Sequence, residues 1–213
     1  RLERALECFP EGDAVEVAFR AFELDPAAPR EVDLSVSYVE RLARKYGASR
    51  QQAEGMIRAM TETAAGDGIV MRFDIIRPGN TFDAHRLLHH ARGRGLGLQL
   101  KERLLRAYLC EGAPIGDHAT LARLAGETGL AEEEAVEVLA SDTHAHQVRS
   151  EEAQARSLGI TGVPFFVIDG RFALAGAQPS DTILHALHEA RATRPEPPAA
   201  TAEGAPLCGP DGC

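Results

Sequence analysis

The sequence predicts an α/β domain that is interrupted by an all-helical insertion. A helix and an alternating apolar segment occupy the first thirty residues, and a long central stretch repeats apolar residues only at helical spacing. From residue 163 the pattern changes to two short apolar runs around an Asp-Gly pair, followed by a last helix. Helices and strands are thus expected near both ends of the chain, and helices alone between them. This arrangement favours one layered domain with an inserted helical segment.

The opening residues are predicted to form a helix and then a strand. Residues 14–22 alternate apolar and polar side chains, which favours a strand. No capping residue precedes the helix, so the chain is expected to open inside it and further residues to precede Arg1. One face of this helix carries the apolar side chains Leu2, Ala5, Leu6 and Phe9.

Helical spacing dominates the central stretch. Gly47 is placed to end one helix and Ser49 to cap the next, and Asn80 is placed to cap a third. A short extended piece is expected at residues 69–73. The predicted helices cover residues 35–46, 49–65, 80–91, 98–108, 117–125, 131–139 and 142–158.

The C-terminal part is predicted to contain a hairpin, a helix and a tail. Strands are expected at 163–168 and 171–175, joined by an Asp169-Gly170 turn, with a helix from about 180 to 192. Residues 193–206 are rich in Pro, Ala, Glu and Thr, which is typical of an extended linker. The expected organisation is a first domain part at 1–30, a helical insertion at 31–158, a second domain part at 159–192 and a flexible tail at 193–213.

Composition excludes some functions. The formal net charge of −9 disfavours nucleic acid as a partner, because phosphate binding needs clustered Lys and Arg. No apolar run approaches the roughly 18–20 residues of a membrane span, and no signal peptide is visible. We therefore expect a cytoplasmic protein without membrane or nucleic-acid partners, whose oligomeric state the sequence leaves open.

Pro164 stands just before a run that is predicted to be a buried strand. Proline has no N–H to give to a ladder, so it is confined to edges, strand starts and bulges. Its position therefore has two interpretations, a tight turn into the strand or a cis peptide bond after Val163. A cis bond would leave the Val163 backbone free to pair with an extended peptide or thiol substrate.

The four cysteines fall into two groups. Cys8 and Cys110 are isolated in helical stretches and are expected to be small core residues. Cys208 and Cys213 close the chain as Cys-Gly-Pro-Asp-Gly-Cys, where the glycines and proline permit a tight ring. Three interpretations stay open for this pair: an accessory redox pair, a flexible tail with two thiols, or half of a metal site that falls short of four ligands.

No metal site is predicted among the histidines. His85, His89 and His90 share one helix, but no carboxylate stands beside them at metal-ligand spacing. A surface or capping role is expected for His89 and His90, whereas His85 is a candidate to face an active-site cleft.

Four segments carry a resemblance to a known family. Residues 161–167 with Gly176-Ala177-Gln178-Pro179 resemble the second half of a DsbA-like thioredoxin domain. Residues 80–87 (Asn-Thr-Phe-Asp-Ala-His-Arg-Leu) and 22–26 (Phe-Glu-Leu-Asp-Pro) resemble the FrnE branch of that family. The resemblance covers the chain from Arg1 to about Ala192 and implies a thioredoxin-like domain with a helical insertion.

The resemblance also implies a substrate-binding wall. It makes Pro164 the cis-proline that faces the active site, with Val163 meeting the substrate backbone after Gly162. Asn80 and His85 match the insertion of the FrnE branch. These are the predicted substrate-binding residues, and the expected substrate is a thiol or disulfide of a peptide or small molecule.

The family carries a Cys-x-x-Cys pair at the start of its first helix, after an N-terminal strand. The 213 residues contain no Cys-x-x-Cys. A helix N-terminus lowers a thiol's pKa and so supplies the thiolate for disulfide exchange. Without that pair the chain is expected to have little dithiol activity there, and Cys208 and Cys213 are the candidate accessory catalytic residues.

Three functions are compatible with these observations. The leading interpretation is a thiol–disulfide oxidoreductase or isomerase of the DsbA-like type that uses no cofactor. The second is a glutathione-dependent isomerase or transferase of the related kappa-type branch, similar to 2-hydroxychromene-2-carboxylate isomerase. The third is a thioredoxin-like binding domain without chemistry.

Overall fold

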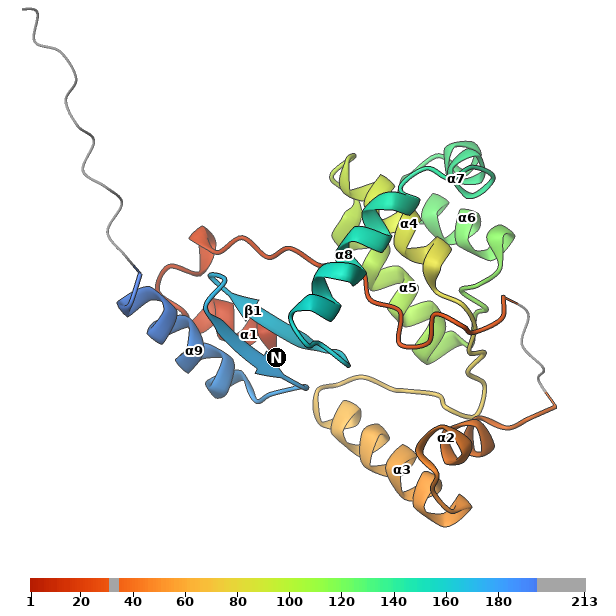
Figure 1. The fold of residues 1–213 in the computed structure, drawn as a ribbon, viewed down its shortest axis with the longest axis horizontal. Coiled ribbons are helices and arrows are strands. Elements are labelled where there is room, and N and C mark those ends of the chain that lie inside the picture. The colour runs from red at the N-terminus through yellow and green to blue at the C-terminus, as the bar shows by residue number, and fades with distance from the viewer. Residues whose placement is uncertain (31–34, 195–213) are drawn as a thin grey trace, which may run out of the picture. The chain divides into compact units, whose positions relative to one another are not determined.

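The computed structural model describes residues 1–30 and 35–194, which group into two compact units (Figure 1). Unit 1 combines residues 1–16 with the chain from Pro164 onward, and unit 2 spans residues 17–163. Unit 1 therefore joins the two ends of the described chain. Unit 2 is the long stretch between them.

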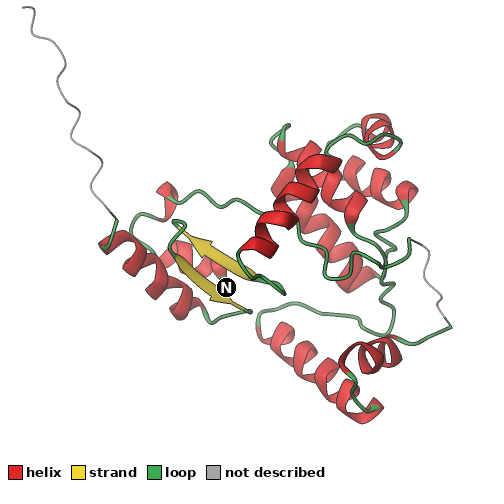
Figure 2. Ribbon diagram, in the orientation of Figure 1, coloured by secondary structure: helices red, strands yellow, loops and turns green. Residues whose placement is uncertain are grey.

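Unit 1 holds a two-stranded antiparallel hairpin, coloured yellow in Figure 2, with two helices packed against it. The helices α1 (Leu2–Cys8) and α9 (Ser180–Ala192) come from opposite ends of the chain and pack on each other. The hairpin consists of β1 (Phe165–Ile168) and β2 (Phe172–Ala175). Its small core is made by Ala5, Phe9, Ile183 and Leu187, with Phe166, Ile168 and Leu174 packed against them.

The hairpin turn confirms the turn that the Asp-Gly pair predicts. Asp169 and Gly170 both have positive φ, 53° and 68°, as a type I′ turn requires. The Arg171 N–H donates to the Ile168 carbonyl at 3.1 Å, and the ladder begins only at Phe172. Arg171 therefore belongs to the turn and not to the second strand.

The strand predicted at residues 14–22 is wrong. The chain forms a short 3-10 turn at Gly12–Ala14 and then continues without a ladder. A strand needs a neighbour, and within the described residues the pairing is that of β1 with β2. In this segment the Ala21 N–H instead donates to the Glu151 carboxylate at 2.6 Å, so a side chain takes the place of a partner strand.

Unit 2 is helical in its described part. Helix α4 packs against α5, α6, α7 and α8, around fully buried leucines that include Leu87, Leu100 and Leu121, while α2 and α3 pack on each other. The bounds are α2 (Tyr38–Tyr46), α3 (Arg50–Gly66), α4 (Phe82–Arg92), α5 (Gly97–Glu111), α6 (His118–Gly126), α7 (Glu132–Leu139) and α8 (Ala145–Ser157).

Capping residues explain where two of these helices begin and where one of them ends. Ser37 and Ser49 each form a capping box with the residue three positions later, and Gly47 ends α2 at φ 59°. The predicted cap of α4 is shifted by one residue, because Thr81 is the N-cap. Asn80 instead accepts the Phe82 N–H with its side-chain oxygen at 2.9 Å.

Helix α8 begins three residues later than the predicted start at residue 142. The preceding residue His144 has a φ of 64°, which interrupts helical backbone. The carbonyls of Ser141 and Thr143 accept hydrogen bonds from the Arg86 guanidinium. A long-range contact therefore holds these residues outside the helix.

Candidate functional site

Pro164 lies in unit 1, immediately before β1. Its carbonyl accepts the Gly176 N–H at 2.8 Å, which closes the open end of the hairpin one step beyond the last paired residues. A proline is tolerated here because the ladder begins at Phe165 and needs no donor from residue 164. Gly176 has a φ of 81°, a conformation that glycine adopts readily.

Gly162 and Val163 are the last residues of unit 2. Val163 is 48% exposed, although a valine next to an apolar strand would ordinarily be buried. A Cβ at Gly162 would meet nothing within 4 Å, so packing alone does not demand glycine there. Both residues have the accessibility that the predicted substrate contact needs.

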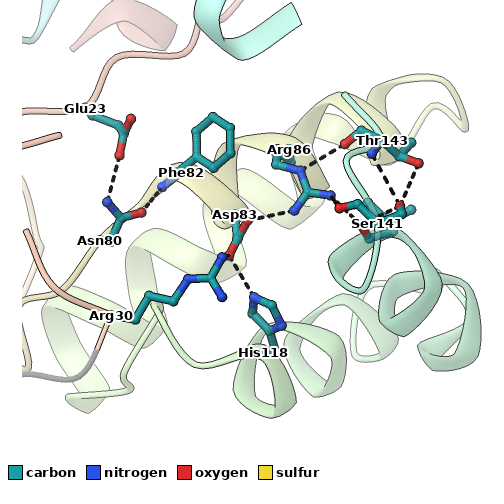
Figure 3. A network of polar contacts seen from close by, with 10 residues as sticks. Glu23, Arg30, Asn80, Phe82, Asp83, Arg86, His118, Ser141 and Thr143 are labelled. Atoms are coloured by element: carbon teal, nitrogen blue, oxygen red, sulfur yellow. Dashed lines mark hydrogen bonds and ion pairs between the residues drawn. The ribbon is translucent and has the colours of Figure 1, made fainter. Parts of the chain in front are cut away.

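Asn80 lies at the start of α4, with both ends of its amide in use (Figure 3). Its Nδ2 donates to Glu23 Oε1 at 3.1 Å, while its oxygen accepts the Phe82 N–H. Asn80 therefore ties the segment around Glu23 to the first turn of α4.

His85 lies one turn further along α4 and contacts the same segment. Its Nε2 is 3.2 Å from the Phe22 carbonyl, an acceptor, so this nitrogen carries the proton. Burial lowers the pKa of His85, and the imidazole is neutral near pH 7. The structure thus brings Asn80 and His85 to consecutive residues of one segment, Phe22 and Glu23.

Glu23 is a buried acid that the sequence pattern did not single out. Arg149 Nη1 contacts its Oε2 at 2.5 Å and Glu152 Oε2 at 2.8 Å. Burial, and then the neighbouring Glu152, raise the pKa of Glu23 against the opposing effect of Arg149. Glu152 Oε1 is buried without a hydrogen-bond partner in the described part of the chain.

One arginine thus serves two buried carboxyl groups, and the pair is short of one positive charge. A carboxyl group in such a place holds its proton to higher pH than a free one. Glu23 is therefore a candidate proton carrier beside Asn80 and His85. Its only sequence signal was membership of the Phe-Glu-Leu-Asp-Pro segment, which says nothing about burial.

A second buried network surrounds Asp83 and Arg86 (Figure 3). Asp83 contacts Arg86 Nη1, Arg30 Nη2 and His118 Nε2, each at 2.7 Å. Burial raises the pKa of Asp83, but the hydrogen bonds from His118 and Arg86 outweigh it and the pKa is lowered. Arg86 also donates to the Val138 carbonyl in the last turn of α7 and to the Ser141 and Thr143 carbonyls that follow this helix. These contacts all fix parts of unit 2, so the network is structural.

The cysteines differ from the expectation in one case. Cys8 is exposed, so the prediction that it is a core residue is wrong, while Cys110 is half-buried. Cys8 falls on the outer side of a short helix whose inner side is filled by Ala5 and Phe9. Cys208 and Cys213 lie outside the described residues.

The described residues contain neither a candidate metal site nor a candidate membrane span. No group of three or more His, Cys, Asp and Glu side chains there has a geometry that could hold a metal ion. None of the helices there is both long and apolar enough to cross a membrane.

Comparison with known proteins identifies the family. The sequence profile of the DSBA-like thioredoxin domain matches residues 1–188. The chain belongs to the DSBA-like thioredoxin family. A crystal structure of a probable DsbA oxidoreductase from Streptomyces coelicolor is similar at 38% identity and a TM-score of 0.88, over 100% of this chain and 89% of that one. The search of curated proteins gave no match.

Membership of the DSBA-like family confirms the predicted fold class, a thioredoxin-like α/β domain with a helical insertion. It also supports an oxidoreductase role in general terms. The assignment of Gly162, Val163, Pro164, Asn80 and His85 to substrate binding stays a prediction.

Proposed function

We propose that this protein is a thiol–disulfide oxidoreductase of the FrnE-like branch of the DSBA-like family, acting on thiols or disulfides of peptides or small molecules. The observation that carries the proposal is the junction before β1. There an exposed Val163 precedes Pro164, whose carbonyl is held by Gly176, in a chain whose solved relative is a probable DsbA oxidoreductase.

In this proposal the backbone of Val163 forms hydrogen bonds with the extended substrate next to the reacting sulfur of that substrate. Pro164 has no N–H, so the β-ladder does not extend to this position and the Val163 backbone stays available. Exchange proceeds when a thiolate attacks a substrate sulfur and a second thiol resolves the mixed disulfide. Overall the dithiol loses two electrons and two protons, and the substrate disulfide is reduced to two thiols. Within unit 2, Asn80 and His85 orient the segment that carries Glu23, a buried acid whose pKa is raised by burial.

The dithiol itself is not in the sequence, because the 213 residues contain no Cys-x-x-Cys. We propose, from the family resemblance, that it belongs before helix α1, and that these 213 residues alone have little dithiol activity. Cys208 and Cys213 are included as an accessory pair that exchanges with the main site.

The test is reduction of insulin disulfides by the full-length gene product, compared with the 213-residue chain. The full-length protein is expected to be active and the 213-residue chain to be much weaker. In the full-length protein Pro164→Ala should lower kcat/KM at least about tenfold, because the residue that shapes the docking backbone is lost. Pro10→Ala is the matched control, since Pro10 is an exposed loop residue after α1.

Absence of dithiol activity in the full-length protein would refute the proposal. If glutathione then raises its melting temperature, the glutathione-dependent alternative gains support. If neither is seen, the non-catalytic binding domain is the remaining interpretation. Equal rates for Pro164→Ala and Pro10→Ala would leave the oxidoreductase role in place but remove Pro164 from the substrate wall.

A further inference from the structure

A shallow hollow of about 350 Å³ opens on the surface of unit 2 beside α4 and the first turns of α8. Arg20, from the segment before Phe22, and Arg92, at the end of α4, contribute guanidinium groups to its lining. His146, Gln147 and Ser150 contribute polar side chains from one side of α8. None of these residues belongs to the proposed oxidoreductase site, and the inference does not depend on that function.

The fixed charges of the hollow do not cancel. Glu151 is its one carboxylate, and it accepts from Arg20 Nη1 at 2.9 Å and from the Ala21 N–H at 2.6 Å. Arg92 Nη1 lies 3.7 Å from the same carboxylate. Because one carboxylate faces two guanidinium groups, the hollow keeps an excess of one positive charge.

A third cation adds to this positive potential. Lys101 lies with its ammonium 3.9 Å from the centre of the Phe19 ring, next to the segment that carries Arg20. Burial, followed by repulsion from Arg92, lowers the pKa of Lys101. Lys101 and Arg92 are therefore close enough to repel each other. This local positive charge contrasts with the overall net charge of −9.

Several donors of the hollow have no acceptor among the described residues. Within the described residues Arg20 uses one guanidinium nitrogen, on Glu151, and Arg92 donates to the Phe19 carbonyl with another. The side chains of His146, Gln147 and Ser150 make no hydrogen bond or ion pair to any other described residue. Donors from three separate segments thus line one concave surface, where they are available to a bound acceptor.

We propose that this hollow binds a small organic anion through carboxylate or phosphate oxygens. A guanidinium fork matches the geometry of both groups, and the adjacent hydroxyl and amide supply further donors. The size of the hollow is at the lower end of the range for small-molecule sites, roughly 300–1,000 Å³. A shallow and solvated site of this kind implies modest affinity, on the order of 1 mM for a single anionic group.

The test is calorimetric titration of the 213-residue protein with two probes, inorganic phosphate and succinate, at constant ionic strength. Saturable binding of at least one probe is expected, and the preferred probe distinguishes a phosphate from a carboxylate ligand. Gln147→Glu places a negative charge on the lining without changing shape and should weaken binding about tenfold or more. Glutamate in the first turn of a helix is favourable, so the variant should fold normally.

Gln154→Glu is the matched control, because it makes the same change on the exposed part of α8 away from the hollow. It should bind like the unchanged protein. Arg92→Lys keeps the charge but loses the fork, and should weaken binding less than Gln147→Glu. The proposal is overturned if neither probe binds at up to about 20 mM, well above the expected order of 1 mM, or if both glutamate variants weaken binding equally.

Discussion

The two units are built on different balances of apolar and charged groups. Unit 1 is held by a small apolar cluster, and its side-chain hydrogen bonds, such as Arg1 to the Ala177 carbonyl at 2.7 Å, are mostly exposed. Unit 2 has a larger apolar core around α4 and also contains the buried charged residues of the described chain. These residues are Glu23, Asp83, Arg86, Glu151 and Glu152.

The difference shows what buried charge does in this protein. Arg86 holds Ser141 and Thr143 between α7 and α8, and Glu151 holds the segment at Arg20 and Ala21. Both segments lack regular structure, so their backbone groups need side-chain partners. In unit 1 the ends of the chain meet through two helices and a hairpin. The hydrogen bonds within these elements satisfy most of their backbone N–H and C=O groups.

The largest expected effect is in unit 2, from removing the Arg86 guanidinium. Arg86→Met keeps the length of the side chain but removes one of the three partners of buried Asp83, which keeps Arg30 and His118, and removes a donor from three carbonyls. Breaking a buried ion pair from one side costs about 3–5 kcal/mol. Urea denaturation should show this loss, and amide hydrogen exchange should show it at Leu87 and Leu121, which are fully buried in unit 2.

Arg106→Met is the control, because that side chain is 72% exposed and its ion pair within the described part of the chain is with Glu111. It should change the free energy of unfolding by less than about 1 kcal/mol. If the two substitutions cost the same, the buried network is not what distinguishes unit 2.

A smaller effect is expected from the apolar core of unit 1. Ile183 is 2% exposed and lies in the cluster with Phe9 and Leu187. Ile183→Ala should cost about 2–5 kcal/mol, with the lower half expected here because a small cluster collapses more readily around the cavity. Loss of exchange protection should centre on β1, β2 and α9.

Breaking the polar contacts of unit 1 should matter much less. Arg191 forms an exposed ion pair with Glu11 at 3.3 Å, and Arg191→Ala should cost less than about 1 kcal/mol. A cost for Arg191→Ala as large as for Ile183→Ala would contradict the apolar description of unit 1.

The same contrast explains how far the sequence could predict the structure. Periodicity and turn chemistry are local, and they predicted the helices of unit 2, the Asp169-Gly170 turn and α9. The strand expected at 14–22 failed because alternation cannot report whether a partner strand exists. Asn80 and His85 were found through resemblance to a motif. Glu23 and Arg86 were missed because their burial depends on contacts with residues more than fifty positions away.

The last prediction concerns pH and applies to unit 2. Burial lowers the pKa of several of its histidines, so the folded state keeps them neutral. In the unfolded chain a histidine takes up its proton near pH 6.5, before the folded state does. The unfolded state then binds more protons, and the free energy of unfolding falls as the pH drops through 6.5. The histidines are His85, His89, His90 and His144.

Glu23 acts in the opposite direction. Because its pKa is raised, the stability it contributes is present at low pH and is lost as the pH rises through its folded pKa. Four histidines oppose one carboxyl group, so a net fall in stability is expected between pH 7.5 and 5.5, smaller than the effect of either core substitution. Urea denaturation at several pH values measures it.

Two variants separate these contributions. His85→Gln keeps a donor for the Phe22 carbonyl but cannot titrate, so it should make the fall shallower. Glu23→Gln keeps an acceptor for Asn80 but removes the opposing proton, so it should make the fall steeper. Parallel pH profiles for both variants and the unchanged protein would mean that these buried groups titrate alike in the folded and unfolded states. His85 and Glu23 would then add nothing to the pH dependence of the stability of unit 2 near neutral pH.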